Sequence, residues 1–272
     1  MWAIEPILAK LSYGNSDFLH TSAIRAIVAA LTAFTYIVLT RKSPLQVTKQ
    51  QLSPLIYIAL VGTLVADFLY FFALSQIPVI NAVVIGHMQP IFIIAFGYFL
   101  LKTDKLTKFD YLGIALMILS GFLVTTKTME NLFTLKFGTI GDLIVLSATI
   151  SWATSAIVMK KYLTAMNAGV ITFYRFFFPA LIFAAYLGMT SSFIINNIYQ
   201  VCIGVVIGVG TILYYEGLKR LKAAQVSGLE LSTPFFAAIL AFLLLSEFIT
   251  GMQIIGIILL FGGVYLISKK EA

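Results

Sequence analysis

Long stretches without charge restrict the fold of this chain more than any other feature. No Asp, Glu, Lys or Arg occurs in six stretches of about one membrane crossing each: 26–40, 52–66, 111–126, 143–159, 231–246 and 248–268. A crossing helix needs about 20 mostly apolar residues to cover a hydrocarbon core of about 30 Å. Two longer charge-free stretches, 68–101 and 176–215, each have room for two crossings, joined by turns at SQIPVIN and GMTSSFIINN. The chain is therefore predicted to cross a membrane many times.

The predicted fold is an all-α integral membrane protein with about ten transmembrane helices. We expect them near 2–12, 21–40, 53–75, 79–101, 109–125, 140–160, 169–188, 198–218, 223–246 and 251–268. The chain is 60% apolar and 11% charged, against about 45–50% and 25% in soluble domains, which excludes a water-soluble globule. A membrane barrel is excluded because its strands would alternate in polarity at every second residue, and the charge-free stretches show no such alternation.

The basic residues predict the orientation. If the N-terminus is cytoplasmic, the inner side collects Arg41, Lys42, Lys49, Lys102, Lys105, Lys108, Lys160, Lys161, Lys219, Arg220, Lys222, Lys269 and Lys270, and the outer side Lys10, Lys127 and Lys136. Cytoplasmic loops carry an excess of Lys and Arg, so we expect a multi-pass protein of the cell (inner or plasma) membrane with both termini cytoplasmic. This topology also accounts for the net charge of +7 without a nucleic-acid-binding surface.

The second half of the sequence repeats the first. Residues match in order at shifts of 150, 144 and 143: Trp2 with Trp152, Arg25 with Arg175, Tyr70 with Tyr214, Pro90 with Pro234, and Gly113 with Gly256. We therefore expect two repeats, 1–126 and 127–272, within one transport domain. Five helices is an odd number, so the second repeat enters the membrane upside down relative to the first. Inverted repeats around a midplane site are typical of many secondary transporters.

Several motifs resemble a known family. They are Gly141 and Asp142 at the start of the sixth helix, Trp152, Arg175 in TFYRF, and the segment 232–266 with Pro234, Glu247 and Gly256. Together they are similar to the EamA-type members of the drug/metabolite transporter superfamily. The first half matches more loosely, because Asp104 replaces the expected Glu one residue late. The resemblance implies a ten-helix carrier of small metabolites and does not specify the substrate.

The first helix is truncated by comparison with its counterpart. About a dozen residues of the sixth helix precede Trp152, whereas only Met1 precedes Trp2. A stretch of roughly eleven residues spans only about 17 Å, half of a bilayer core. Two explanations are open. Either the start codon is placed too late, which the length favours, or the first helix is a half-span supported by its neighbours.

Charged side chains inside the predicted helices are candidate proton-coupling or gating residues, because charge in a membrane is costly and usually faces the bundle interior. Helix depth places Glu5, Arg25, Asp67 and His87 toward the outer side and Arg175 and Glu230 toward the inner side, as two gates would require. Asp67 and Glu230 have no basic residue within one helical turn. They are therefore the preferred candidates.

The other intramembrane charges have competing interpretations. Arg25 and Arg175 either form part of a gate or extend their guanidinium groups to lipid phosphate at the membrane surface. His87 couples protons or is a satisfied buried histidine. Glu216 is expected to form ion pairs with Lys219 and Arg220, one turn away.

Pro90 and Pro234 mark the middle of the fourth and ninth helices, where each breaks the helix and frees the carbonyl four residues earlier. Broken helices in membranes are tolerated where they line a cavity. The candidate substrate-binding residues lie beside these prolines or on the matching aromatic positions: Trp152, Tyr70, Gln89, Tyr214, Ser232 and Thr233. Trp2 and Trp152 either pack in the core or form an aromatic wall for a flat or cationic ligand.

These features favour secondary transport of an amino acid or a similar zwitterionic or cationic solute, by alternating access between the repeats. The sequence has no GxxxxGK(S/T) phosphate loop and no metal-ligand motif, so we expect no catalytic residue, metal or cofactor. The expected partners are the solute, the lipid bilayer and, if transport is coupled, protons, with a monomeric or homodimeric chain. The alternative is an integral-membrane enzyme or accessory protein that acts on a lipid-linked substrate through Asp67, His87 and Glu230.

Overall fold

The structure is a computed structural model that describes residues 1–40, 45–98, 107–190, 194–220, 226, 230 and 232–268. Within these residues, helices are the only regular elements: α1 (Glu5–Ser12), α2 (Phe18–Thr40), α3 (Lys49–Tyr57), the π-helix η1 (Ile58–Asp67), α4 (Phe68–Leu74), α5 (Val79–Gly86), α6 (Gln89–Phe96), α7 (Lys108–Thr126), α8 (Met129–Phe133), α9 (Ile140–Tyr162), α10 (Ala168–Met189), α11 (Ile198–Arg220), α13 (Ser232–Leu245) and α14 (Gly251–Ser268).

Eight helices of the described chain are long and apolar enough to cross a membrane. One of them, Lys49–Leu74, comprises α3, η1 and α4, and another, Val79–Phe96, comprises α5 and α6. The predicted all-α, multi-span membrane fold is confirmed. The remaining two predicted crossings correspond to shorter helices, α1 with 8 residues and α13 with 14. Most of the segment 223–231, expected to begin the ninth crossing, lies outside the described residues.

Two local expectations need correction. The helix expected over 2–12 begins only at Glu5, and Trp2 lies in the turn that precedes it. The short helix α8 was not predicted from the sequence; it begins where the Thr128 side chain accepts a hydrogen bond from the Asn131 N–H.

Threonines begin three of the helices through capping boxes, in which a side chain and a backbone N–H three residues apart satisfy each other. At the start of α9, Thr139 Oγ1 accepts from the Asp142 N–H at 3.3 Å and Asp142 Oδ2 accepts from the Thr139 N–H at 2.8 Å. The same arrangement begins α3 at Thr48 and α7 at Thr107. These local signals fix where the crossings start.

The bundle is held together by helices that approach closely at small residues. Helix α2 packs against α10 and α11, and α7 packs against α14. A Cβ atom placed on Gly113 of α7 would lie 2.7 Å from the Gly263 carbonyl oxygen of α14. Because lipid offers no hydrophobic drive for helices to associate, such close backbone contact is a main source of their packing energy.

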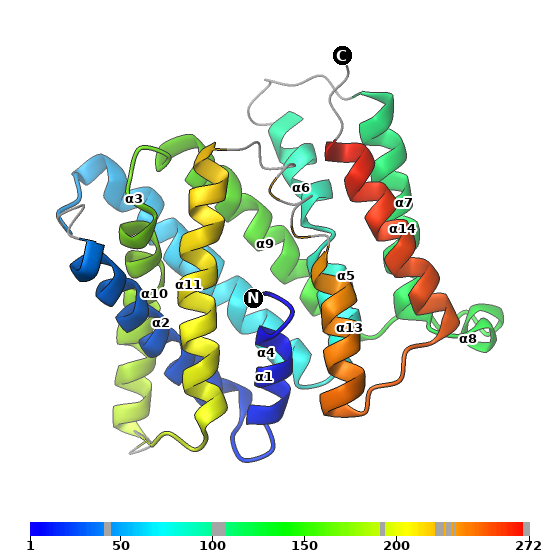
Figure 1. Cartoon of the computed structure of the whole chain (residues 1–272), viewed down its shortest axis with the longest axis horizontal. Coiled ribbons are helices and arrows are strands. Elements are labelled where there is room, and N and C mark those ends of the chain that lie inside the picture. Colours follow the sequence, from blue (N-terminus) through cyan, green and yellow to red (C-terminus); the bar gives the residue numbers. More distant parts are fainter. Residues whose placement is uncertain are drawn as a thin grey trace.

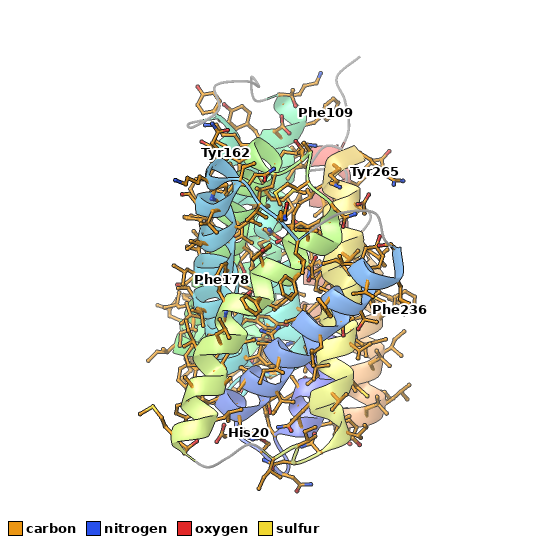
Figure 2. The ribbon with its side chains drawn as sticks, turned by 90° about the vertical axis from the view of Figure 1, so that its left-hand side faces the viewer. His20, Phe109, Tyr162, Phe178, Phe236 and Tyr265 are labelled. Carbon is orange, nitrogen blue, oxygen red and sulfur yellow. The ribbon has the colours of Figure 1, made fainter. Side chains whose placement is uncertain are left out.

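Figure 1 shows α2, α3, α10 and α11 on one side of the molecule and α7 and α14 on the other, with α1, α4, α5, α9 and α13 between them. In the side view of Figure 2, Phe178 and Phe236 project from the flanks, whereas Tyr162 and Tyr265 lie toward one end and His20 toward the other. Tyr162 and Tyr265 are exposed. Tyrosines at the ends of a bundle and apolar side chains on its flanks are typical of a protein surrounded by lipid.

Candidate functional site

A cavity of about 120 Å³ lies in the middle of the bundle. It is lined by residues from both halves of the sequence, and eleven of the fourteen predicted site residues are among them: Glu5, Asp67, Tyr70, His87, Gln89, Pro90, Trp152, Arg175, Tyr214, Glu230 and Pro234. Of the other three, Arg25 does not line the cavity but contacts Glu5 and Asp67, which do, and Thr233 is buried without lining the cavity. The side chain of Ser232 lies outside the described part of the structure.

Irregular helices shape this cavity. The π-helix η1 ends at Asp67, and π-helical turns are frequent at functional sites because they reorient side chains. The fourth crossing is broken at His87 and Met88, between α5 and α6. Pro90 is the second residue of α6, a position where its missing N–H removes no helical hydrogen bond. The expected helix break is therefore present, and Pro90 starts the second half-helix.

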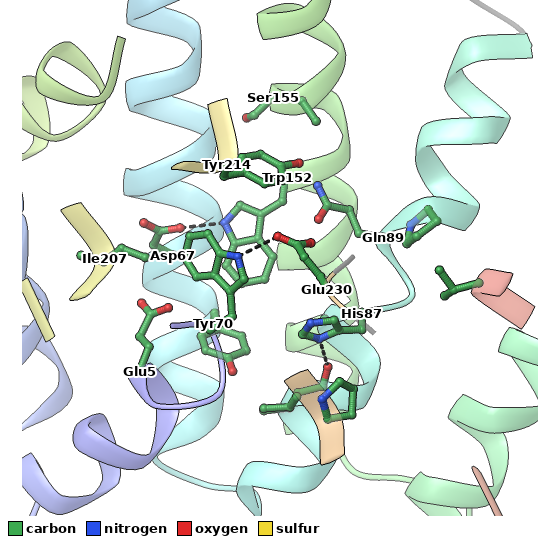
Figure 3. Close-up of a pocket in the computed structure, with 18 of the residues that line it drawn as sticks. Glu5, Asp67, Tyr70, His87, Gln89, Trp152, Ser155, Ile207, Tyr214 and Glu230 are labelled. Carbon is green, nitrogen blue, oxygen red and sulfur yellow. Dashed lines mark hydrogen bonds between the residues drawn. The ribbon is translucent and has the colours of Figure 1, made fainter. Parts of the chain in front are cut away.

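The carbonyl expected to be freed by Pro234 is not free. The Glu230 carbonyl oxygen accepts a hydrogen bond from the Thr233 N–H at 2.9 Å. Pro234 is the third residue of α13, so the turn before it tightens and satisfies this oxygen locally. The Glu230 carbonyl is therefore not an orphaned acceptor, and the carboxylate is the group of Glu230 that faces the cavity (Figure 3).

Asp67 is the centre of a buried charge cluster. Its Oδ2 atom accepts from Arg25 Nη2 at 3.0 Å, and its Oδ1 atom accepts from Arg175 Nη2 at 3.1 Å. Oδ1 also accepts from Trp152 Nε1 at 2.7 Å (Figure 3). Glu5 Oε1 accepts from the other terminal nitrogen of Arg25 at 3.2 Å. Two carboxylates and two guanidinium groups thus neutralise each other within the bundle.

This cluster corrects the expected separation into outer and inner gates. Arg175, assigned to the inner group, contacts Asp67, assigned to the outer group, and its side chain is only 9% exposed. The Arg25 side chain is 1% exposed. Neither arginine extends to the membrane surface, so the lipid-phosphate interpretation is wrong for both. Depth measured along each helix separated Arg175 from Asp67 because it takes no account of helix tilt (Figure 1) or of the π-helix η1 that ends at Asp67.

Each arginine is also held by its own surroundings. Arg175 donates to Thr63 Oγ1 at 3.2 Å and to the Tyr215 hydroxyl at 3.2 Å. The Arg25 guanidinium lies over the Phe71 ring, 4.3 Å from its centroid. Sequence reasoning did not include Thr63 among the site residues, because nothing in the sequence distinguishes it from other helical threonines.

Glu230 differs from the other buried carboxylates. Its Oε1 atom accepts from Trp2 Nε1 at 2.7 Å (Figure 3), and none of the ion pairs among the described residues involves it. Glu216, in contrast, pairs with Lys219 at 3.1 Å and Arg220 at 3.3 Å, as expected. The cavity therefore contains one carboxylate whose charge no described side chain neutralises.

His87 lies at the break between α5 and α6, where its Nδ1 atom is 2.7 Å from the Val83 carbonyl oxygen. A carbonyl only accepts, so Nδ1 carries the proton of this contact. In the neutral ring, Nε2 is then an acceptor on a residue that lines the cavity. The histidine is thus partly satisfied by its own helix and still presents one polar atom at the cavity.

Aromatic rings form much of the cavity wall. Trp152 lies 5.1 Å from Tyr70 between ring centroids, and Trp2 lies 6.3 Å from Tyr214. Gln89 lines the cavity beside them. All five side chains line the cavity, so both tryptophans belong to its wall. Such faces attract cations electrostatically, with an energy of about 0.5–2 kcal/mol.

Comparisons with known proteins match this architecture. The model of the EamA-like transporter family matches residues 1–126 and 139–269. Two relatives, both named uncharacterized transporter, come from Synechocystis sp. and Methanothermobacter thermautotrophicus. Each is 28% identical, over 76% and 78% of this chain respectively, and the chain spans 63% of the length of both relatives.

Protein LicB of Haemophilus influenzae is 22% identical over 72% of this chain and 68% of its own length. A solved crystal structure superposes with a TM-score of 0.68 at 15% identity, covering 98% of this chain and 95% of that chain, which shows a shared fold. The chain thus combines a multi-span helical fold with a central cavity. The chain belongs to the EamA-like transporter family, which confirms the family indicated by its motifs.

Proposed function

We propose that this transporter carries a small cationic or zwitterionic solute, such as an amine or an amino acid, across the cell membrane by alternating access between two inverted halves. The observation that carries this proposal is the charge balance of the cavity. The charges of Glu5, Asp67, Arg25 and Arg175 cancel within their cluster, and Glu230 is the carboxylate of the described cavity wall that forms no ion pair. A solute with an ammonium group supplies an ion-pair partner for this carboxylate.

The cavity walls and volume support the same solute class. The Trp2, Trp152, Tyr70 and Tyr214 rings provide apolar and cation-attracting faces beside Glu230. The volume of about 120 Å³ is somewhat below the roughly 150 Å³ of an apolar protein cavity that takes up benzene. The favoured solute is therefore a small one, of amino-acid size or less.

The arrangement of the helices supports two related halves. The pair Trp152 and Tyr70 uses residues that the sequence repeat matches to Trp2 and Tyr214, and both pairs are in ring contact in the cavity wall. Helix α2 packs against α10 and α7 against α14, each against its expected counterpart. In a secondary transporter such halves rock against each other around a shared midplane site. Glu230 then binds solute and proton in turn.

Uptake of radiolabelled amines and amino acids into proteoliposomes that contain only this protein tests the proposal. Glu230→Gln keeps the size and hydrogen-bonding capacity of the side chain while removing its charge, so uptake or its pH dependence should be lost. Glu216→Gln is the matched control, since Glu216 pairs with Lys219 and Arg220 outside the cavity wall. A Glu230→Gln protein with normal uptake and an unchanged pH profile would refute the role of Glu230. Chemical conversion of the solute without accumulation would favour the membrane-enzyme alternative.

A further inference from the structure

A chain of buried hydrogen bonds joins three helices at one end of the cavity. Asn81 of α5 donates from Nδ2 to Asp142 Oδ1 of α9 at 2.9 Å. The Asn81 Oδ1 atom accepts from Gln253 Nε2 of α14 at 3.0 Å. All three side chains are buried, with exposed fractions of 0%, 5% and 2%. The side-chain amide of Asn81, in the first half of the sequence, therefore hydrogen-bonds through both its nitrogen and its oxygen to residues of the second half.

The direction of each hydrogen bond in this chain follows from chemistry. A carboxylate only accepts, so Asn81 must turn its NH₂ group toward Asp142 and its oxygen toward Gln253. Gln253 must then donate to Asn81, which leaves its own oxygen to accept from the Thr250 N–H at 2.9 Å. At the other end, Asp142 Oδ2 accepts from Thr139. Each amide nitrogen and each side-chain oxygen of the three residues therefore has a partner in a single consistent arrangement.

The network lies beside the cavity and toward one end of the bundle. Helices α5, α9 and α14 begin at this end, the lower end in Figure 1. Asn81 does not line the cavity, whereas the next two residues of α5, Ala82 and Val83, do. The N-terminus of α5 is held here as well, because Val79 N–H donates to Glu247 Oε2 in the α13–α14 connection at 2.8 Å.

Interhelical hydrogen bonds can serve as a contact that forms and breaks during transport, provided that water reaches them. Breaking such a bond in a dry interior is costly, because the donor and the acceptor are left without partners. The cost falls when water enters, because water replaces the lost partners. Interhelical hydrogen bonds in membrane proteins are individually modest, so such a contact can open reversibly. Alternating access needs a contact of this kind between the halves.

We propose that the hydrogen-bonded chain of Asn81, Asp142 and Gln253 is a latch that closes the cavity at the end where α5, α9 and α14 begin. Opening the latch gives the solute access from this side. The inference rests on the proposed transport function, because a closed end has a purpose only if it also opens. Asn81 is a positioning residue: it sets the place of α5, whose following residues line the cavity.

Labelling of a cavity residue tests the latch without reference to any solute. The reporter is Ser155→Cys, at a buried residue of the cavity wall, in a Cys202→Ser background, which removes the single native cysteine. Its reaction with an impermeant maleimide is measured separately from each side of the membrane. Asn81→Ala should speed labelling from the latch side by about tenfold, the bias expected from two interhelical hydrogen bonds of usual strength. Labelling from the opposite side should stay constant or fall.

Two further variants make the test decisive. Gln253→Leu keeps a side chain of similar volume but removes the group that donates to Asn81, so it should have the same effect as Asn81→Ala. The test then still applies if one of the two variants fails to fold. Asn131→Ala makes the same chemical change in α8, where the amide donates to the Thr126 carbonyl of the preceding segment, and should leave both rates unchanged. Unchanged labelling in both latch variants, or an equal increase from both sides, would overturn the latch. Either result is independent of the uptake experiment, so failure of the latch is distinguishable from failure of the transport proposal.

Discussion

Asp67→Asn is the substitution that most directly tests the charge cluster. The change keeps the size of the side chain but removes the charge shared by Arg25 Nη2 at 3.0 Å and Arg175 Nη2 at 3.1 Å. It also places an NH₂ group where one carboxylate oxygen accepts hydrogen bonds. Arg25 then retains Glu5 as its partner, whereas Arg175 loses its only carboxylate among the described residues.

The expected effect is large because the cluster is dry. Side-chain exposure is 3% for Asp67 and 1% and 9% for the two arginines. Removing one member of a buried ion pair costs about 3–5 kcal/mol, because the remaining charge is left uncompensated. We therefore expect Asp67→Asn to lower the free energy of unfolding by about this amount. Glu216→Gln breaks a partly exposed pair and should cost only about 0–1 kcal/mol.

Denaturant titration in mixed micelles, followed by circular dichroism, measures this difference. A double-mutant cycle with Arg175→Gln adds a second criterion: the double variant should be more stable than the sum of the single changes predicts, by about 1–3 kcal/mol. If Asp67→Asn is no more destabilising than Glu216→Gln, or if the two single effects are additive, the cluster does not stabilise the bundle as argued.

Three further outcomes are expected. Trp152→Phe keeps a ring in the cavity wall but loses the donor to Asp67 Oδ1, so solute affinity should fall several-fold while the protein stays monodisperse; unchanged affinity would exclude Trp152 from the site. Burial raises the pKa of the Glu247 carboxyl above its ordinary value of 4.5, so the folded state holds this proton more tightly than the unfolded chain. The protonated Glu247 carboxyl therefore contributes to folding stability below pH 4.5, and this contribution is lost as the pH rises through the folded-state pKa. Thermal melts over a pH series should show this loss of stability for the unmodified protein and not for Glu247→Gln. The substitutions Lys219→Cys and Lys105→Cys each introduce a cysteine that should react only with membrane-permeant reagents in intact cells; Lys105 lies outside the described residues. Labelling by an impermeant reagent from outside would reverse the predicted orientation.

The sequence alone could predict the membrane-spanning helices, because the bilayer imposes a constraint that is local along the chain. A helix must satisfy its own backbone in lipid and present about 20 apolar residues, so absence of charge marks each crossing. The same cost of buried charge identified the ionisable residues of the cavity wall other than its tyrosines, namely Glu5, Asp67, His87, Arg175 and Glu230. Capping signals such as Thr139 with Asp142 fixed helix starts for a similarly local reason.

Only the tertiary structure decided which of these groups meet. The Asp67 and Arg175 side chains are 108 positions apart in the sequence and 3.1 Å apart in space. Depth along a helix does not reveal such a pairing, because helix tilt, the π-helix η1 and the break at His87 shift each side chain relative to its neighbours. The Asn81 network was likewise invisible, since each of its members reads as an isolated polar residue. Electrostatic attraction between distant segments in a low-dielectric interior determined that Asp67 pairs with both arginines. Glu230, in contrast, faces the cavity without an ion pair among the described residues.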